Sequence, residues 1–269
     1  MKKIALLLVI VIFLSTMLTS CSMLPDYVMR EVYDFFGGGR KYSKEINYQL
    51  DRNGYGYSAS KFYCSDNDVR IRPTFKNKPV TTIEDYTFSA CDNINSVTIP
   101  DGVTSIGNYA FFSCRNLTRV TIGNSVASIG EAAFGGCISL ESINIPDSVT
   151  SIGEGAFFHC ENLTSVTIPD SVTHLGAAAF SCCDSLTYVT IPEGILALPE
   201  GLFSGCDLLT IVTIPSSVLA IDAQVFQDCK NLTKIYFRGT EAEWNKISKA
   251  SGWDKNTGNY TIIFNYTGK

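Results

Sequence analysis

The feature that most constrains this chain is a repeat of 23 residues that runs without an insertion. A cysteine, a phenylalanine and a β-branched residue each recur at that spacing, in fixed phase with one another. A period in the twenties predicts a solenoid, which grows by stacking units along a line. The three series are Cys91, Cys114, Cys137, Cys160, Cys183, Cys206 and Cys229; Phe88, Phe111, Phe134, Phe157, Phe180, Phe203 and Phe226; and Val97, Val120, Ile143, Val166, Val189, Val212 and Ile235.

Each unit contains signals for two short extended runs and a turn. The segment LTSVTI (residues 163–168) alternates β-branched residues up to Pro169 and predicts a short strand. The segment SVTSIG (residues 148–153) predicts a second extended run, and EGAFFHC (residues 154–160) predicts one or two helical turns. Only stacked coils can shield the side chains directed inward, which in one coil are Leu163, Val166, Ile168, Val172, Leu175, Ala179, Phe180 and Cys183.

The repeated pattern VTIPxSVTSIGxxAFxxC resembles the BspA-type leucine-rich repeat, over roughly residues 69–237. The resemblance implies a β-rich α+β solenoid, a right-handed leucine-rich repeat stack with a parallel strand sheet on one face. It also implies a secreted or surface protein of the kind found in bacteria and some protists, where members with a known role mostly act in adhesion or ligand binding. The first unit matches least well, because about five extra residues precede Val80.

The N-terminus predicts export. Lys2 and Lys3 precede an apolar run over residues 4–14, which is too short to span a bilayer, so a signal peptide over residues 1–20 is the better interpretation. The tetrapeptide LTSC, ending at Cys21, resembles a bacterial lipobox, which implies a lipidated cysteine and a membrane-anchored lipoprotein at the cell surface or outer envelope. An ordinary cleavage site nearby is the alternative. Residues 21–45 then form the lipidated N-terminus and a spacer.

Caps are expected at both ends, because a solenoid end exposes core and strand edges. Upstream, Asn53-Gly54 separates two alternating runs and predicts a hairpin over residues 46–62, within an N-terminal cap of residues 46–67. The solenoid then occupies residues 68–238. Downstream, in a cap of residues 239–269, Thr240 and Glu243 form a capping box that starts a helix, and residues 260–266 predict a closing strand.

The cysteine series admits packing, disulfide and metal-binding interpretations. Zinc ligands usually come as close pairs such as C-x₂-C, whereas one thiol per coil predicts a straight file about 4.8 Å apart. Parallel side chains also suit a disulfide poorly. We therefore interpret the thiols as buried packing residues and keep the other two as lesser alternatives. Cys182 lies outside the series at a position expected to be exposed, where it is either a reactive or an inert surface cysteine.

The sequence gives little support for nucleic-acid binding, catalysis or metal binding. A net charge of −5 and the lack of a dense Lys/Arg block argue against a nucleic-acid partner. His159 and His174 share no serine or carboxylate at a recurring spacing, so no catalytic residue, metal ligand or cofactor is predicted and the chain is not expected to be an enzyme. The row Asp101, Asn124, Asp147, Asp170, Glu193 and Ser216 is interpreted as solvated turns, and the recurring NLT at Asn116, Asn162 and Asn231 as a structural turn.

A ligand surface is predicted beside the inward strand residues. Alternation sends Val166 and Ile168 inward, so Ser165 and Thr167 point out of the sheet. Exposed aromatic and arginine residues are enriched in binding hot spots, and several interrupt this otherwise small, polar face. The candidates are Arg119, Thr121, Asn144, Ser165, Thr167, Tyr188, Thr190, Ile211, Thr213, Lys234 and Tyr236. The alternative is that threonine simply favours strands and that the large residues have no role.

The expected function is therefore macromolecular binding by an exported, lipid-anchored monomer, with adhesion to host or neighbouring cells as one form of it. The partner would be a protein or a glycan at the cell surface, and the lipid would supply the membrane contact. The alternative is a passive structural or scaffold component of the envelope without a specific ligand.

Overall fold

The structure is a computed structural model that describes residues 46–62, 64 and 66–268. The predicted signal peptide, the lipidation of Cys21 and the spacer over residues 21–45 lie outside these residues. Within the described part of the chain, no helix combines the length and the apolar character needed to cross a bilayer.

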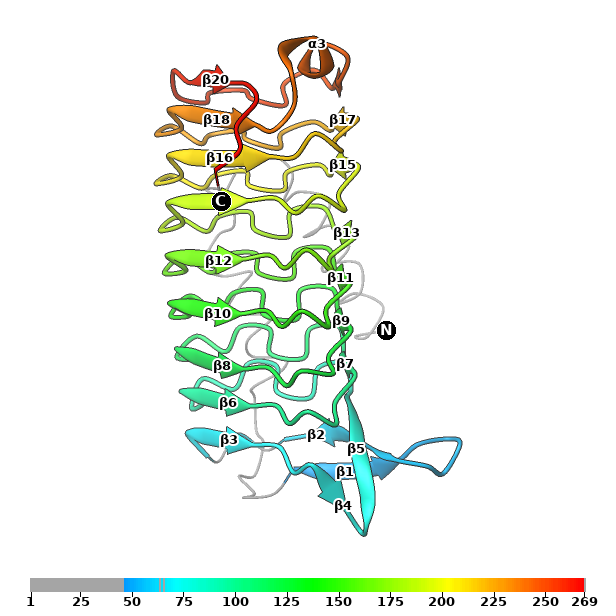
Figure 1. Ribbon diagram of the computed structural model, residues 1–269. Helices are drawn as coiled ribbons and strands as arrows, with labels where there is room; N and C mark the ends of the chain where they lie inside the picture. The colour runs from blue at the N-terminus through cyan, green and yellow to red at the C-terminus, as the bar shows by residue number, and fades with distance from the viewer. Residues whose placement is uncertain (1–45, 63, 65, 269) are drawn as a thin grey trace, which may run out of the picture.

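The chain forms a β-solenoid whose coils stack along one axis (Figure 1). One side of each coil is a short strand, and equivalent strands pair in parallel with a shift of one repeat, as Ile143 does with Val166. These strands are β3 (Asp68–Arg70), β6 (Ser96–Thr98), β8 (Arg119–Thr121), β10 (Ser142–Asn144), β12 (Ser165–Thr167), β14 (Tyr188–Thr190), β16 (Ile211–Ile214), β18 (Lys234–Phe237) and β20 (Thr261–Ile263). We call their outer surface the strand face.

A second side of each coil carries another strand, which is two residues long in all of them except β5 (Figure 1). These strands also pair in parallel at the same shift, as Ile152 does with Leu175. They are β5 (Lys78–Ile83), β7 (Ser105–Ile106), β9 (Ser128–Ile129), β11 (Ser151–Ile152), β13 (His174–Leu175), β15 (Ala197–Leu198), β17 (Ala220–Ile221) and β19 (Ser248–Lys249). The solenoid predicted from the repeat is confirmed.

The third side of each coil is a run of turns, so the prediction of helical turns is wrong. Gly155, Phe157 and His159 donate their backbone N–H groups to the next coil, at 2.8, 2.8 and 3.0 Å. Gly155 and His159 have φ of 57° and 55°, in the left-handed region that a right-handed helix never uses. Alternate residues therefore face the neighbouring coil, and the turn run is hydrogen-bonded between coils rather than within a helix.

The core fills the space between the three sides. All eight residues expected to point inward from one coil, Leu163 to Cys183, are buried. The repeated phenylalanines stack nearly parallel from Phe88 to Phe226, with ring centroids 4.8 to 5.9 Å apart. Phe62 packs at the N-terminal end of this aromatic column and Trp253 packs edge-on at its C-terminal end. Each cap thus supplies one aromatic ring that completes the column.

The N-terminal cap contains the expected hairpin, with a longer connection than predicted. Strands β1 (Asn47–Leu50) and β2 (Tyr57–Lys61) are antiparallel, and β2 pairs in parallel with β5. Residues 51–56 connect them, and within this loop Gly54 has a positive φ of 73° whereas Asn53 does not. The loop is therefore longer than the Asn53-Gly54 pair that signals the hairpin, and only Gly54 of that pair has a positive φ. The extra residues before Val80 form β4 (Thr74–Phe75), which pairs antiparallel with β5.

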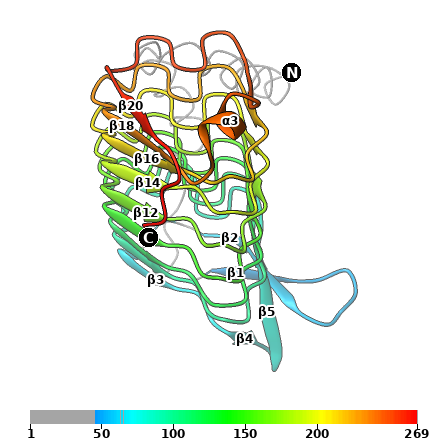
Figure 2. The same ribbon diagram turned by 45° about the horizontal axis from the view of Figure 1, so that its top comes forward.

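The C-terminal cap begins with a short helix that ends before Ile247. Thr240 caps helix α3 (Glu241–Trp244) and exchanges hydrogen bonds with Glu243, which completes the capping box. Trp244 and Ile247 are buried against the last coils. Strand β20 pairs with β18 and is the last strand on the side of the strand face. The chain then crosses the outer side of β18 and β16 (Figures 1 and 2). We call residues 264–268 the C-terminal tail.

Both sheets are interrupted at one coil boundary, which we call the seam. One pair of sheets ends at β12 and β13, and another begins at β14 and β15. In earlier coils Gly153 and Gly176 donate N–H to the preceding coil, at 2.9 and 2.8 Å. Pro199 occupies the equivalent position, and proline has no N–H to donate. The turn run continues across the seam, because Ala178 donates to Glu200 at 2.8 Å and Phe180 to Leu202 at 3.0 Å.

Candidate functional site

The strand face presents a flat, mostly uncharged surface along the solenoid. In β8, β10 and β12 a buried central residue lies between two outward ones, as the alternation predicts. Tyr188 protrudes furthest among the candidate side chains of β14, with 54% of its surface exposed. Of the predicted residues, Arg119, Thr121, Asn144, Thr167 and Lys234 are exposed, and Ser165, Thr190 and Ile211 are half-buried.

Two predicted site residues do not contribute as expected, because the C-terminal tail crosses this part of the face. Thr213 in β16 is only 6% exposed, so the expectation of an exposed outward side chain is wrong there. Tyr236 is half-buried and stacks on Tyr266 of the tail, with ring centroids 4.1 Å apart. The tail is fixed by backbone bonds from Asn265 to Gly239 and from Tyr266 to Phe237. The tail therefore leaves the strand face open on the N-terminal side of β16, and we call its part from β6 to β14 the open strand face.

Polar side chains at both edges of the strand face bond to the backbone of the neighbouring coil. Thr164, next to β12, donates its hydroxyl to the carbonyl of Glu141 at 3.1 Å, and Thr210 donates to Thr187 at 2.9 Å. At the other edge, the Asp101 carboxylate accepts the backbone N–H of Asn124 at 2.8 Å. These bonds hold successive strands in one register, so the outward side chains keep a constant spacing.

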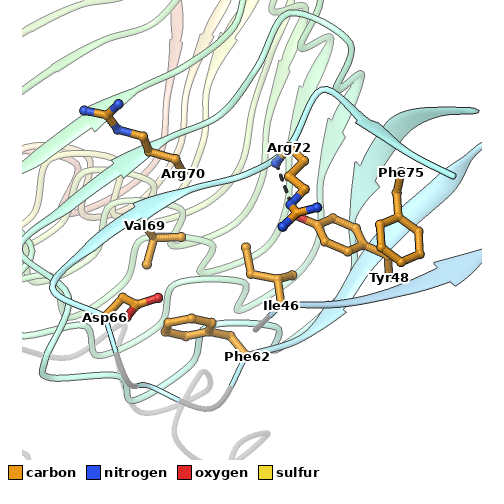
Figure 3. A pocket seen from close by; sticks show the side chains of 8 residues that line it. All are labelled: Ile46, Tyr48, Phe62, Asp66, Val69, Arg70, Arg72 and Phe75. Carbon is orange, nitrogen blue, oxygen red and sulfur yellow. Dashed lines mark hydrogen bonds between the residues drawn. The ribbon is translucent and has the colours of Figure 1, made fainter. Parts of the chain in front are cut away.

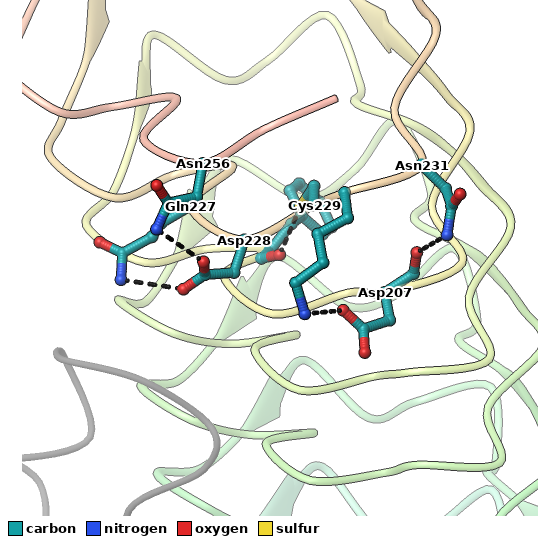
Figure 4. Close-up of polar contacts among 8 residues, drawn as sticks. Asp207, Gln227, Asp228, Cys229, Asn231 and Asn256 are labelled. Atoms are coloured by element: carbon teal, nitrogen blue, oxygen red, sulfur yellow. Dashed lines mark hydrogen bonds and ion pairs between the residues drawn. The ribbon is translucent and has the colours of Figure 1, made fainter. Parts of the chain in front are cut away.

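Two of the recurring asparagines have the structural role that was predicted for them. Asn116 donates its amide to the carbonyl of Asp92 at 2.8 Å, one coil earlier. Asn231 donates in the same way to Asp207 at 2.7 Å (Figure 4). Each of these amides thereby satisfies a turn carbonyl of the preceding coil.

The repeated thiols are buried and take part in hydrogen bonding. Six of them, from Cys114 to Cys229, are free and buried, as predicted. Each donates to the backbone carbonyl of the phenylalanine 26 residues earlier, at 3.0 to 3.3 Å, as Cys229 does to Phe203 (Figure 4). Burial raises the pKa of the Cys114 and Cys229 thiols to about 12, so neither is a nucleophile at neutral pH.

Two cysteines depart from the prediction. Cys91 forms a disulfide with Cys64, which ties the N-terminal cap to the first coil. Cys91 is the first cysteine of the series, and a cap rather than a full coil precedes it. Because its spacing matches that of the other cysteines, the sequence did not indicate that Cys91 is the one that forms a disulfide. Cys182 is 1% exposed, so the expectation of a surface position is wrong.

The histidines and recurring glutamates do not assemble into a reactive site. His159 lies 3.5 Å from Glu161, and burial lowers the pKa of its imidazole while that carboxylate raises it. His174 is exposed on β13, and Glu131 accepts a hydrogen bond from Tyr109. Among the residues that the structure describes, no group of three or more His, Cys, Asp or Glu side chains is placed to hold a metal ion.

A hollow of about 240 Å³ lies at the N-terminal end and was not predicted. Ile46, Phe62 and Val69 line it, and Asp66 and Arg72 face it from two sides (Figure 3). Tyr48 accepts the backbone N–H of Arg72 at 3.1 Å. The hollow is smaller than the roughly 300–1,000 Å³ of typical small-molecule sites. The open strand face is therefore the stronger candidate for a functional surface.

Comparison with known families identifies the repeat. The BspA type leucine rich repeat region matches residues 62–160 and 128–249, in six copies. The chain belongs to this BspA-type leucine-rich repeat family. Membership agrees with the parallel strand side and with the repeated Phe and Cys positions described above.

Solved structures of leucine-rich repeat proteins share this fold. The leucine-rich repeat protein of T. pallidum is similar with a TM-score of 0.67 and 28% identity, over 72% of this chain and 91% of that one. A leucine-rich repeat protein from Bacteroides ovatus gives a TM-score of 0.69 and 30% identity, over 82% of this chain and 58% of that one. The BspA-type chain thus spans less than two thirds of the Bacteroides protein. A comparison with curated proteins gave no match.

Proposed function

We propose that the protein binds another macromolecule, a protein or a glycan, through the open strand face from β6 to β14. The observation that carries this proposal is Tyr188, an aromatic side chain 54% exposed at the far end of an otherwise small, polar surface. Large exposed aromatic residues dominate the energetics of many interfaces, and a flat surface of this kind suits a large partner better than a small molecule. Such binding at a cell surface would serve adhesion.

The same proposal places the protein outside the cytoplasm, held to a membrane through lipid on Cys21. Two features support it: the N-terminal export pattern and the disulfide between Cys64 and Cys91, a bond that persists mainly in oxidising compartments. Mass spectrometry of the mature N-terminus tests the anchor. A diacylglyceryl group on Cys21 is expected, and an unmodified Cys21 would overturn it.

Capture of surface proteins and glycans by the full chain tests the binding surface. Tyr188→Ala should remove captured partners, because it deletes the most exposed aromatic side chain of the strand face. Tyr55→Ala is the matched control, since Tyr55 is 80% exposed on the hairpin loop, away from this face. Equal capture by both variants would sink the proposal and favour a passive envelope component without a specific ligand.

A further inference from the structure

The distribution of charge along the chain is highly uneven. Residues 120–229 contain twelve aspartates and glutamates and no lysine or arginine. The two ends of the described chain have the opposite balance: residues 46–80 and residues 230–268 each contain six basic and three acidic residues, whereas the intervening residues 81–119 contain two basic and four acidic residues. The central coils of the solenoid are therefore strongly acidic, and both ends are basic.

Some of this acidity borders the open strand face. Asp147 and Asp170 follow β10 and β12 at one edge, and both are exposed. Neither carboxylate has a hydrogen bond or ion pair with any residue that the structure describes. At the other edge, Glu161 and Asp184 precede β12 and β14. The outward residues of β10, β12 and β14 are themselves uncharged, so a neutral strip lies between two rows of carboxylates.

Two ion pairs with lysine or arginine neutralise carboxylates of this acidic region, and both lie near its C-terminal end. Arg238 reaches Glu193 at 3.0 Å, and Lys230 reaches Asp207 at 3.2 Å. Both cations flank β18, the last strand before the C-terminal cap. Burial raises the pKa of Asp184 to about 6, and the neighbouring Glu161 and Asp207 carboxylates add to this shift. Because no metal-binding group is present among the described residues, the charge is spread along the surface rather than gathered into an ion site.

We infer that the part of the open strand face over β10, β12 and β14, past the exposed Arg119 of β8, binds a basic protein segment whose lysine and arginine side chains meet the carboxylate rows at the edges. The hydroxyl and amide groups of the strip, and Tyr188 beside them, contact the middle of that segment. This inference rests on the proposed function and narrows it to one partner chemistry. Acidic glycans are excluded by like-charge repulsion, which disfavours wrong partners at an interface.

Selection of peptides on the immobilised full chain tests the inference. The probe is a phage-displayed library of random 12-residue peptides, and the affinity of selected peptides is then measured at low and high NaCl concentration. Enrichment of lysine and arginine is expected, with weaker binding at high salt because the ions screen exposed charges. Selected peptides without such enrichment would overturn the inference.

Matched charge variants locate the interaction. The double variant Asp147→Asn, Asp170→Asn removes two charges at the edge of the strand face. Glu200→Gln, Asp222→Asn removes the same charge near β15 and β17, on the second side of the coil. We expect the edge variant to weaken peptide binding roughly three- to tenfold and the control variant to change it less than about twofold. Equal effects would show binding to net charge alone and would overturn the inference.

A third variant separates the inference from the proposed function. Tyr188→Ala should weaken binding of the same peptides, because the proposed function and the inference both place the contact on the open strand face. If Tyr188→Ala weakens binding while the selected peptides lack basic residues, the strand face binds another chemistry and only the inference fails. If Tyr188→Ala leaves binding unchanged, the strand face is not the binding surface and both fail.

Discussion

At the scale of single residues, one cysteine per coil acts as both a packing and a hydrogen-bonding group. Its inward position could be predicted, because the cysteine recurs in phase with the buried phenylalanines. Its acceptor could not, because the carbonyl that Cys160 reaches belongs to Phe134 in the preceding coil. That contact depends on how the coils stack, which spacing in sequence does not specify.

The thiols make stability sensitive to alkaline pH. Folding raises their pKa, to about 12 for Cys114 and Cys229, because burial disfavours the thiolate. In the unfolded chain the cysteine thiols ionise near pH 8.5. The stability that the buried, protonated thiols contribute is therefore fully present below that pH and is lost as pH rises towards 12. We expect the free energy of unfolding, measured by urea titration, to fall steeply between pH 9 and pH 11. Each such thiol adds about 1.4 kcal/mol per pH unit to the slope.

Cys160→Ala provides the control for this pH dependence. The variant should be less stable at pH 7 by about 1–3 kcal/mol, because the Phe134 carbonyl loses a donor and a small cavity opens. Its slope between pH 9 and pH 11 should be shallower, because one fewer thiol ionises. A slope equal to that of the parent chain would contradict the explanation that ionisation of the buried thiols causes the loss of stability.

Asp184 predicts a pH effect in the acidic range. Burial and the neighbouring Glu161 and Asp207 raise its pKa to about 6, above the value near 3.9 of the unfolded chain. Protonated Asp184 thus contributes stability that is present below pH 4 and lost as pH rises through 6. Asp184→Asn should therefore raise the melting temperature at pH 7 and leave it nearly unchanged at pH 3.5. The exposed Asp170→Asn serves as the control, and an equal gain from both variants would refute the explanation.

At the scale of elements, strands were predictable and turns were not. Strand alternation and Pro169 define β12, and the capping box of Thr240 and Glu243 defines α3. The turn run was mistaken for helix because its left-handed positions are often not glycine: Ala132 and Ala178 have φ of 45° and 53°. Contacts between coils hold these residues in that conformation. The path of the C-terminal tail, which covers Thr213, likewise follows from tertiary contacts that no local pattern encodes.

The seam should open more readily than the other coil boundaries. Leu219 donates its N–H to Leu196 at 2.8 Å and Thr173 donates to Thr150 at 3.0 Å, but within the described chain Leu196 donates no such bond to Thr173. We expect the Leu196 amide to exchange hydrogen at least about tenfold faster than those of Thr173 and Leu219. Amide exchange followed by NMR measures this difference directly.

A substitution tests whether Pro199 causes the seam. Pro199→Gly restores an N–H that can reach the carbonyl of Leu175, as Gly176 reaches Ile152 at 2.8 Å in the coil before. The exchange of Leu196 should slow in this variant. Unchanged exchange would mean that the interruption has another cause.

At the scale of the whole molecule, the fold is long, acidic in the middle and closed by its caps. The repeat predicted the long stack, since each coil buries its core only against its neighbours. The caps were recognised from their own signals, namely the hairpin and the capping box. The disulfide from Cys64 to Cys91 was not, because both cysteines had to be placed in space before their proximity was visible.

The acidic middle predicts that salt stabilises the protein. Twelve carboxylates without a lysine or arginine over residues 120–229 repel one another in the folded state, and ions screen that repulsion. The melting temperature, measured by calorimetry at pH 7, should rise between 20 and 300 mM NaCl. Glu200→Gln, Asp222→Asn should show a smaller rise because two charges are gone. A melting temperature that falls with salt would contradict this account.

The aromatic column ends in Phe62 and Trp253, and these two rings differ in packing geometry from the nearly identical pairs between them. The interior coils before the seam are thus interchangeable, whereas the two ends are unique. Deleting or duplicating 23 residues there would leave the repeated Phe stacking and the Cys-to-carbonyl bonds with equivalent partners. Recombination between similar repeats can therefore change the length of the solenoid in steps of one coil, and the length of the open strand face can change without a new fold.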